Sequence, residues 1–333
     1  AYRFSTIRTP CYALGVQTRH RVLFRSATDL SELADRSVDL VVTSPPYPMI
    51  EMWDATFASQ DAAIEEVLAE GDGPAAFEAM HALLDRVWRE CARVLRDGGF
   101  LCINVGDATR TVDGTFRLYT NHSRITSACE AMGLQSLPAI LWRKPTNAPN
   151  KFMGSGMLPS GAYVTLEHEY VLVLRKGGKR SFGTEEKERR RRSAFFWEER
   201  NQWFSDLWDL KGVRQQMLPR EARERSGAFP FELAFRLIAM YSLEGDLVLD
   251  PFLGTGTTLL AAVAGARSSV GMEIDRELRP TIEQSVGPSV PALNRRQERR
   301  ARDHIDFVER YTAERGKAPG HRNRFYDVPV VTT

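Results

Sequence analysis

The sequence contains few cysteines, and they are widely spaced. The four cysteines among 333 residues, Cys11, Cys91, Cys102 and Cys129, form no CxxC pair. This spacing argues against a disulfide framework and against a cysteine-ligated zinc site. The six histidines also lack metal-ligand spacing, so we expect no bound metal.

Long apolar runs are also missing. No run reaches the roughly 18 apolar residues that a membrane helix needs, and the best candidate, LAFRLIAMYSL, is interrupted by Arg236. The first ten residues, AYRFSTIRTP, lack the apolar core of a signal peptide. An apolar content of 43% and a charged content of 26% are typical of a soluble globular protein. We therefore expect no membrane partner and a reducing, cytoplasmic location.

The net charge is small, but the charges are unevenly distributed. The whole chain carries +2, yet residues 175–225 contain 15 Lys/Arg against 9 Asp/Glu, and residues 294–324 contain 10 against 5. The rest of the chain is therefore acidic. Two basic segments on an acidic body are the distribution expected of a protein that binds a polyanion. The alternative is a set of solvated, arginine-rich helix faces without a ligand.

Alternating strand and helix patterns predict an α/β fold with a mostly parallel sheet. Apolar runs rich in β-branched or aromatic residues predict strands over 38–44, 99–105, 246–252 and 268–275. Between the first two strands, apolar residues recur at three- and four-residue steps from Phe77 to Leu95. This spacing predicts a helix that Pro74 opens and Gly98 closes.

The strand and helix pattern changes in the middle of the chain. Residues 134–144 and 168–178 predict two strands that finish one edge of the sheet. Segment 179–210 mixes arginine runs with six aromatic residues between 195 and 208, and we interpret it as an inserted element outside the sheet. The aromatics could form a small core or stack on bases. Residues 230–243 predict an amphipathic helix, and residues 294–311 predict a charged helix.

A glycine-rich loop, DPFLGTGTT (250–258), follows one predicted strand. Gly254 and Gly256 allow a tight turn and a close backbone approach to a ligand, and the next helix offers unpaired N–H groups. Glu273, at the end of the next predicted strand, is placed to accept hydrogen bonds from a ribose diol. The full GxGxxG motif and the Walker lysine are both absent. Loop and acid together favour an adenosine-containing cofactor, whereas the loop alone could be a structural turn.

A second loop, TSPPY (43–47), ends the first predicted strand. Pro45 and Pro46 fix their own φ and hold the preceding residues extended. The Ser44 hydroxyl and the Pro45 carbonyl can then both point away from the strand end. Two rigid acceptors suit a planar NH2 group, and Tyr47 offers a face on which a ring can stack. The alternative is a proline-rich turn that only ends the strand.

TSPPY followed by DPFLGTGTT, with FPFELAFRLI just before the second motif, resembles the motifs of the DNA amino-methyltransferases. These enzymes transfer methyl from S-adenosyl-L-methionine to N4 of cytosine or N6 of adenine. The order, catalytic loop before cofactor loop, is similar to that of the permuted beta class. The resemblance implies a Rossmann-like methyltransferase fold with a circularly permuted motif order and an inserted target recognition region. It covers roughly residues 20–175 and 228–280.

The resemblance also implies roles for individual residues. The catalytic motif comprises Ser44, Pro45, Pro46 and Tyr47. The cofactor site comprises Asp250, Pro251, Phe252, Gly254, Gly256, Thr257 and, for the ribose, Glu273, with Phe229, Pro230 and Glu232 at the methionine end. Where the family often has Gly-Asp near the cofactor adenine this chain has FRSATDL, so Ser26 or Asp29 is expected there. The residues expected at DNA phosphates are Arg189, Arg190, Arg191 and Arg192.

Four regions are expected on this basis. They are a catalytic part (1–174), a basic and aromatic insert expected to be the target recognition region (175–227), a cofactor-binding part (228–287) and a basic C-terminal helix and tail (288–333).

The implied reaction is site-specific methylation of double-stranded DNA. The target base must leave the duplex, because its amino nitrogen is otherwise inaccessible. Ser44 and the Pro45 carbonyl would accept the two amino hydrogens while the nitrogen attacks the methyl group in line. Serine at the first motif position resembles the N4-cytosine enzymes, so N4-cytosine methylation is expected. N6-adenine methylation is the alternative, and a catalytically silent DNA-binding protein of the same fold is a more distant one.

Two further expectations concern chemistry and partners. A carbon-5 cytosine methyltransferase needs a nucleophilic cysteine, and Pro10-Cys11 precedes the first predicted strand without a nearby cofactor loop. That reaction is therefore disfavoured.

The resemblance suggests a cognate restriction endonuclease as a partner.

Overall fold

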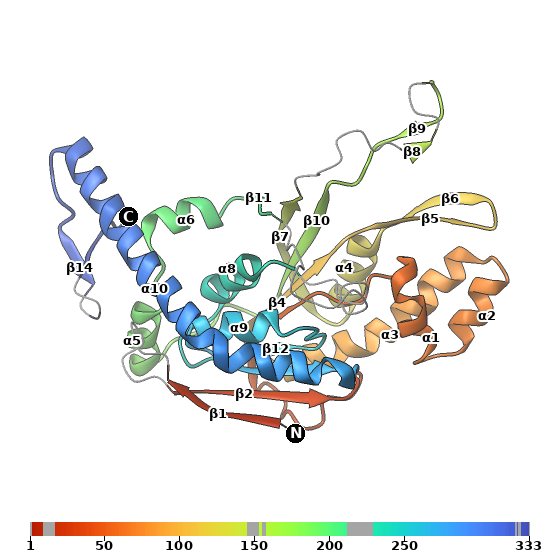
Figure 1. Ribbon diagram of the computed structural model, residues 1–333, viewed down its shortest axis with the longest axis horizontal. Coiled ribbons are helices and arrows are strands. Elements are labelled where there is room, and N and C mark those ends of the chain that lie inside the picture. The colour runs from red at the N-terminus through yellow and green to blue at the C-terminus, as the bar shows by residue number, and fades with distance from the viewer. Residues whose placement is uncertain are drawn as a thin grey trace.

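The computed structural model has a central sheet with helices packed on both faces (Figure 1). The structure describes residues 2–8, 17–144, 153–154, 158–211, 229–323, 325 and 328–332. Pro10-Cys11, most of the 145–157 loop and the 212–228 part of the insert lie outside these ranges.

Nine strands of the described residues form one sheet, in the order β1-β2-β13-β12-β3-β4-β10-β7-β11. Their bounds are β1 Tyr2–Arg8, β2 Gln17–Phe24, β3 Val38–Thr43, β4 Leu95–Val105, β7 Leu134–Arg143, β10 His168–Lys176, β11 Leu207–Asp209, β12 Leu247–Asp250 and β13 Ser268–Glu273. Strands β2, β13, β12, β3 and β4 are parallel, whereas β10 runs antiparallel to both β4 and β7, and β1 to β2. The predicted α/β fold with a mostly parallel sheet is confirmed.

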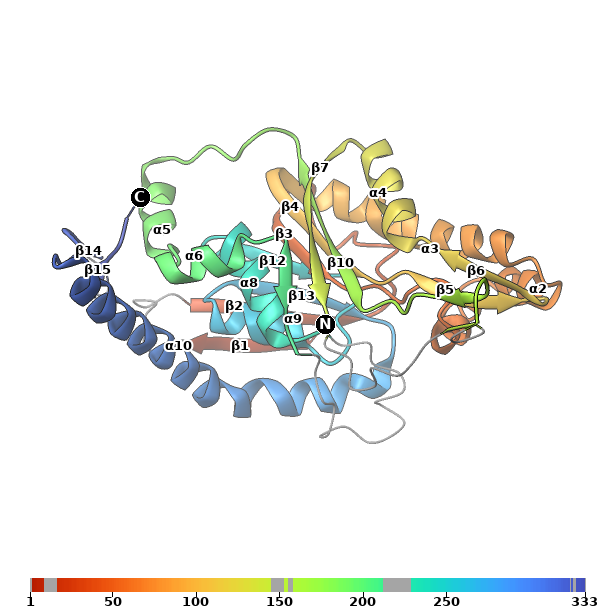
Figure 2. The ribbon, with the colours of Figure 1, turned by 90° about the horizontal axis from the view of Figure 1, so that it is seen from above.

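Helices cover both faces of this sheet. Their bounds are η1 Glu51–Trp53, α1 Asp54–Ala58, α2 Ala63–Ala69, α3 Gly73–Val94, α4 Asn121–Ala131, α5 Thr184–Arg192, α6 Trp197–Trp203, α8 Phe231–Tyr241, α9 Thr257–Ala264, η2 Arg276–Leu278 and α10 Arg279–Arg315. Figure 2 shows α3 and α4 on one side of the strands and α8, α9 and α10 on the other. None of the helices in the described part of the chain is long and apolar enough to span a membrane.

Each face of the sheet has its own apolar core. Along β3, Val41 belongs to the core under α3 and α4, whereas its neighbours Leu40 and Val42 belong to the core under α8 and α9. Successive side chains of a strand point to opposite faces. The continuous apolar run of this strand is therefore buried on both sides, as expected of a central parallel strand.

The elements predicted around the two loops are present. The predicted strands correspond to β3, β4, β12 and β13, and the helix that Pro74 was expected to open is α3. The Asp72 side chain caps this helix by accepting a hydrogen bond from the Ala75 N–H at 2.9 Å. The predicted helix over 230–243 is α8.

The prediction that segment 179–210 lies outside the sheet was wrong. Its residues 207–209 form β11, which pairs in parallel with β7. Trp208 is only 1% exposed, and the Trp142 indole donates a hydrogen bond to the Leu210 carbonyl at 2.9 Å. A three-residue strand is too short to show periodicity. The strand forms because Trp208 is buried against residues of α8.

Strand β2 was not predicted, because buried polar residues hide its alternation. Thr18 and His20 both face inward. The His20 ring bonds the Ser269 hydroxyl at 2.8 Å and the Thr18 hydroxyl at 3.0 Å, so the polar atoms are satisfied. Burial lowers the pKa of His20 to about 4.

The C-terminal helix is also longer than predicted, since α10 continues through Pro288 and Pro291 while packing on α9.

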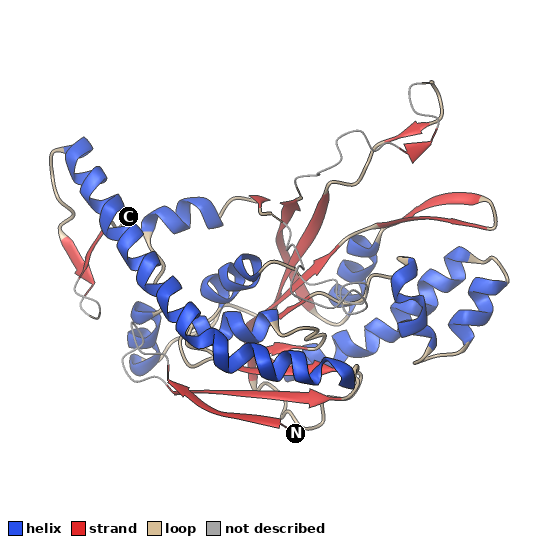
Figure 3. Cartoon of the chain, viewed as in Figure 1, coloured by secondary structure: helices blue, strands red, loops and turns tan. Residues whose placement is uncertain are grey.

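Short hairpins complete the fold. Their strands are β5 Ala108–Val112 with β6 Thr115–Tyr119, β8 Met153–Gly154 with β9 Ala162–Tyr163, and β14 His321–Asn323 with β15 Val328–Val330. The first two hairpins extend beyond the helical layers (Figure 3). They touch each other, because the Phe116 and Tyr163 rings stack with centroids 5.0 Å apart. The β5–β6 hairpin follows β4, so it projects from the carboxyl edge of the parallel strands.

Candidate active site

The two loops singled out in the sequence leave the same edge of the sheet. Strands β3 and β12 are adjacent and parallel, with Leu40 opposite Val248 and Val41 opposite Leu249. Because parallel strands end at one edge, TSPPY and the glycine loop start side by side. The Thr43 hydroxyl donates a hydrogen bond to Asp250 Oδ1 at 2.6 Å, which ties the two strand ends together.

Asp250 anchors the start of the glycine loop. Its side chain is 2% exposed, and the same Oδ1 accepts a hydrogen bond from the Phe252 N–H at 3.0 Å. Burial raises the pKa of Asp250 to about 6, although the hydrogen bonds oppose that shift. The carboxyl group therefore acts inside the protein, where it sets the path of the loop.

The glycine loop adopts backbone geometry that favours glycine. Gly254 has φ +54° and Gly256 has φ +92°, where Gly256 caps the start of α9. A Cβ added at Gly254 would meet no atom within 4 Å, so the backbone there faces open space. A ligand can therefore approach the loop and the N–H groups at the start of α9.

Glu273 lies beside this loop, at the end of the neighbouring strand β13. Its Oε2 accepts a hydrogen bond from the Gly254 N–H at 2.8 Å, and its Oε1 accepts one from the Asp275 N–H at 2.7 Å. Burial raises the pKa of Glu273 to about 7. An acidic side chain here, next to open glycine backbone, fits the ribose of an adenosine-containing cofactor.

Two more of the expected cofactor residues also lie at this edge. Thr257 is the first residue of α9, and Phe252, which follows Pro251, contacts Trp88 edge to face with centroids 5.9 Å apart.

Ser26 follows β2, whose last residue, Phe24, pairs with Glu273. The Ser26 hydroxyl bonds the Thr28 hydroxyl at 3.1 Å. Asp29 forms an ion pair with Arg25 at 2.6 Å, and Ser26 and Asp29 both stay candidates for the adenine side.

The expected methionine-end residues begin α8. Phe229 is buried, and Pro230 caps the helix. Glu232 forms ion pairs with Arg236 at 2.9 Å and with Arg296 of α10 at 2.5 Å. Its charge is therefore already balanced within the protein.

The TSPPY loop is held by a polar network that the sequence did not reveal. The Tyr47 hydroxyl donates to Glu169 Oε2 at 2.8 Å and accepts from the Asn104 amide at 2.9 Å, and it lies 3.1 Å from the Ser44 hydroxyl. Burial, reinforced by the Glu169 charge, raises the pKa of Tyr47 well above its usual value. The Lys144 ammonium contacts the other oxygen of Glu169. The only sequence signal was an acid in the otherwise apolar strand HEYVLVL.

A second set of buried groups supports the chain after this loop. The Asn121 amide donates to the Pro48 carbonyl at 3.1 Å and to the Gly106 carbonyl at 3.0 Å. Its oxygen lies 3.0 Å from His81 Nε2. Burial lowers the pKa of His81 to about 3, so this histidine stays neutral and structural.

The expected DNA-contacting arginines lie at the opposite edge of the sheet. Arg189 pairs with Asp246 at 2.6 Å, and Arg192 pairs with Glu244 at 3.3 Å, just before β12 begins. Arg191 pairs with Glu188 at 2.6 Å, and Arg190 lies over the Phe182 ring. The structure therefore does not bring this run to the two loops.

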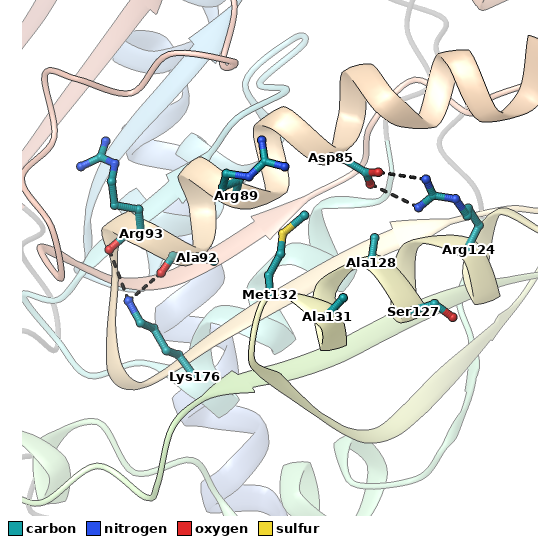
Figure 4. A pocket seen from close by; sticks show the side chains of 10 residues that line it. All are labelled: Asp85, Arg89, Ala92, Arg93, Arg124, Ser127, Ala128, Ala131, Met132 and Lys176. Atoms are coloured by element: carbon teal, nitrogen blue, oxygen red, sulfur yellow. Dashed lines mark hydrogen bonds and ion pairs between the residues drawn. The ribbon is translucent and has the colours of Figure 1, made fainter.

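A groove of about 880 Å³ lies between α3 and α4 (Figure 4). Two of its cations are engaged: Arg124 pairs with Asp85 at 2.9 Å, and Lys176 donates to the Ala92 and Leu95 carbonyls at the end of α3. The groove contains none of the loop residues described above. Within the described ranges, no group of three or more His, Cys, Asp or Glu side chains could hold a metal ion.

The TSPPY loop and the glycine loop on adjacent parallel strands, with an acid on the next strand, are the arrangement expected of a Rossmann-like methyltransferase that depends on S-adenosyl-L-methionine. Residues 38–284 match a family model described as DNA methylase. The chain belongs to this N6/N4 DNA methylase family, as the resemblance implied.

Similar proteins cover most of the chain. The type II methyltransferase M.MthZI of Methanothermobacter thermautotrophicus is 52% identical over 296 residues, which is 88% of this chain and 83% of that protein. The type II methyltransferase M.MjaI of Methanocaldococcus jannaschii is 46% identical over 286 residues, 83% of this chain and 93% of that protein. TTHA0409 of Thermus thermophilus, solved with S-adenosyl-L-methionine, has 34% identity and a TM-score of 0.62 over 82% of this chain and 96% of that one.

Proposed function

We propose that this chain is a type II DNA methyltransferase that methylates N4 of cytosine in double-stranded DNA. The observation that carries the proposal is that the TSPPY loop and the glycine loop follow adjacent parallel strands, whose ends Thr43 and Asp250 join at 2.6 Å. The type II names of M.MthZI and M.MjaI support the same class of activity and a cognate restriction endonuclease as a partner.

In this proposal the cofactor binds along the glycine loop. S-adenosyl-L-methionine supplies a sulfonium methyl group. The Gly254 and Gly256 backbone and the start of α9 face it, Glu273 accepts from the ribose hydroxyls, and Ser26 borders the adenine. Phe229 and Pro230 shape the methionine end through the start of α8.

The target base is held by the TSPPY loop. Tyr47 stacks on the extruded ring, which contributes about 1–3 kcal/mol and offsets part of the cost of flipping. The Ser44 hydroxyl and the Pro45 carbonyl accept the two amino hydrogens. This orients the nitrogen lone pair toward the methyl group for direct attack, without a covalent enzyme intermediate.

The serine in the first motif position is the reason to prefer cytosine. Among the amino-methyltransferases that this chain resembles, a neutral hydroxyl there is more typical of N4-cytosine enzymes than of N6-adenine enzymes. We keep the four expected regions in the proposal, with the 175–227 insert as the candidate target recognition region.

Nucleoside analysis tests this proposal directly. The purified chain is incubated with S-adenosyl-L-methionine and mixed-sequence DNA, and the digested nucleosides are measured by mass spectrometry. We expect 4-methylcytosine from the parent chain and from Ser127→Ala, an exposed serine on α4, and none from Ser44→Ala. Only 6-methyladenine would assign the activity to adenine. Intact cofactor binding without a methylated base would indicate a silent DNA-binding protein.

A further inference from the structure

We propose that Glu169 is a positioning residue that acts through Tyr47 to turn the Ser44 hydroxyl into a hydrogen-bond acceptor for the target amino group. This inference rests on the proposed methyl transfer to a nucleobase amino group. It addresses a problem that serine creates in this motif. A hydroxyl carries a hydrogen as well as two lone pairs, whereas the reaction needs lone pairs that face the amino group.

The contacts define a short chain of hydroxyl groups that ends in a carboxylate. Ser44 Oγ lies 3.1 Å from Tyr47 Oη, and Tyr47 Oη lies 2.8 Å from Glu169 Oε2. Glu169 is 8% exposed and projects from β10, which pairs with β4 beside the TSPPY strand β3. The carboxylate is therefore brought to the loop by the sheet, 122 residues away in sequence.

Asn104 decides the direction of the first hydrogen bond. Its amide nitrogen donates to Tyr47 Oη at 2.9 Å and to Glu169 Oε2 at 2.6 Å. Its own oxygen has no hydrogen-bond partner within the described part of the chain. A flipped amide would place that oxygen against the Glu169 carboxylate, so the nitrogen must face the cluster.

The remaining directions follow from counting donors and acceptors. A carboxylate only accepts, so the Tyr47 hydrogen points to Glu169. Tyr47 Oη already accepts from Asn104 and has one lone pair left, which can only receive the Ser44 hydrogen. With its hydrogen committed to Tyr47, Ser44 Oγ presents two lone pairs to the base.

The hydrogen bonds from Ser44 through Tyr47 to Glu169 also offer a route for the proton that is released. After methyl transfer the amino nitrogen carries a positive charge and one hydrogen too many. Its N–H bond breaks as an O–H bond forms at Ser44, the Ser44 hydrogen passes to Tyr47, and the Tyr47 hydrogen passes to Glu169. Each hydroxyl loses and gains one hydrogen, so the net result is a neutral methylated base and a protonated Glu169.

Lys144 makes glutamine a poor substitute at position 169. The Lys144 ammonium contacts Glu169 Oε1, while Tyr47 and Asn104 both use Oε2. A glutamine must point its NH2 either at the lysine or at the Tyr47–Asn104 side. Either orientation sets two donors against each other. The variant Glu169→Gln therefore opposes Lys144 or reverses the hydrogen bond to Tyr47, and in either orientation it removes the carboxylate that receives the proton, without changing the size of the side chain.

The test measures single-turnover methylation, cofactor affinity and thermal unfolding in matched variants. We expect Glu169→Gln and Tyr47→Phe each to lower the methylation rate about 100-fold, with the cofactor dissociation constant unchanged. The double variant should be no slower than the slower single variant, because both act on one chain of hydrogen bonds. Glu167→Gln, an exposed glutamate two residues earlier, is the matched control and should keep the parental rate.

A rescue experiment separates this role from a purely structural one. In a Ser44→Asp background the first acceptor has no hydrogen to direct, so Glu169→Gln should change the rate by no more than about threefold. Parental activity of Glu169→Gln, losses that multiply in the double variant, or an undiminished effect in the Ser44→Asp background would each overturn the inference. If the parent chain methylates no DNA, the proposed function itself fails.

Discussion

Asp250 and Glu273 are two buried carboxyl groups at the glycine loop, the first at its start and the second on the neighbouring strand, and burial raises the pKa of both. Asp250 accepts hydrogen bonds from the Thr43 hydroxyl and the Phe252 N–H. Glu273 accepts them from the N–H groups of Gly254 and Asp275. A charged carboxylate in this place is costly for the protein without its cofactor. The charged form of each carboxyl group therefore lowers the stability of the cofactor-free protein.

The pH dependence of stability should reveal this cost at Glu273. Its pKa rises from 4.5 in the unfolded chain to about 7 in the folded chain. Between these values the folded state holds a proton that the unfolded state has lost, so the free energy of unfolding decreases as pH rises. We expect Glu273→Gln to remove this decrease, which is on the order of 3 kcal/mol.

Urea unfolding of the cofactor-free protein from pH 4.5 to pH 8 measures the effect. Relative to the parent chain, Glu273→Gln should gain stability as pH rises and reach a constant difference above pH 7. The exposed Glu65→Gln, on α2, serves as the control and should follow the parent at every pH. A constant difference between Glu273→Gln and the parent over the whole range would contradict the expected pKa.

At the scale of elements, β11 joins the insert to the sheet. Trp208 is 1% exposed, its indole donates to the Trp203 carbonyl at 3.1 Å, and the Arg236 guanidinium lies over its ring. The preceding residue, Leu207, is 58% exposed although it belongs to the same strand. One buried face of this short strand therefore helps to fasten the insert to the sheet, together with ion pairs such as Arg189–Asp246.

Truncating the two neighbouring side chains tests this attachment. We expect Trp208→Ala to lower the free energy of unfolding by about 3–5 kcal/mol, because it leaves a large cavity between β11 and α8. Leu207→Ala should cost less than about 1 kcal/mol, because its side chain is already in solvent. Equal losses in chemical denaturation would show that burial of Trp208 does not fasten β11 to the sheet.

At the scale of the whole molecule, the arginine run and the two loops lie at opposite edges of the sheet. In Figure 1 the arrow of β2, which is parallel to the loop-bearing strands, points away from α5. The β5–β6 hairpin projects from the carboxyl edge and carries Arg117, which is exposed. DNA that presents a base to Ser44 must approach this carboxyl edge.

The salt dependence of DNA binding can distinguish the two edges. Each phosphate contact that is lost reduces the slope of log K against log salt by about 1. From their positions, we expect Arg117→Gln to reduce the slope and the double variant Arg190→Gln/Arg191→Gln to leave it unchanged. A reduced slope in the double variant alone would support the phosphate contacts expected from the sequence.

Local patterns were sufficient for the main elements and the two motifs. The run VDLVV, the periodic residues of α3 and the glycines before α9 all act through neighbours in sequence, so their structures could be predicted from short segments. Strand β2 and strand β11 could not be predicted in this way. Buried polar partners stabilise the first, and a single tryptophan docked on α8 stabilises the second, so both depend on distant contacts.

The sequence by itself determined the class of protein, because TSPPY and DPFLGTGTT carry their chemistry in consecutive residues. Only the tertiary structure decided which side chains complete the site. Glu169 reaches Tyr47 because β10 pairs with β4, and Arg189 leaves the site because α5 packs at the other edge. Short-range order fixes backbone shape, whereas the meeting of distant side chains depends on how the strands are ordered in the sheet.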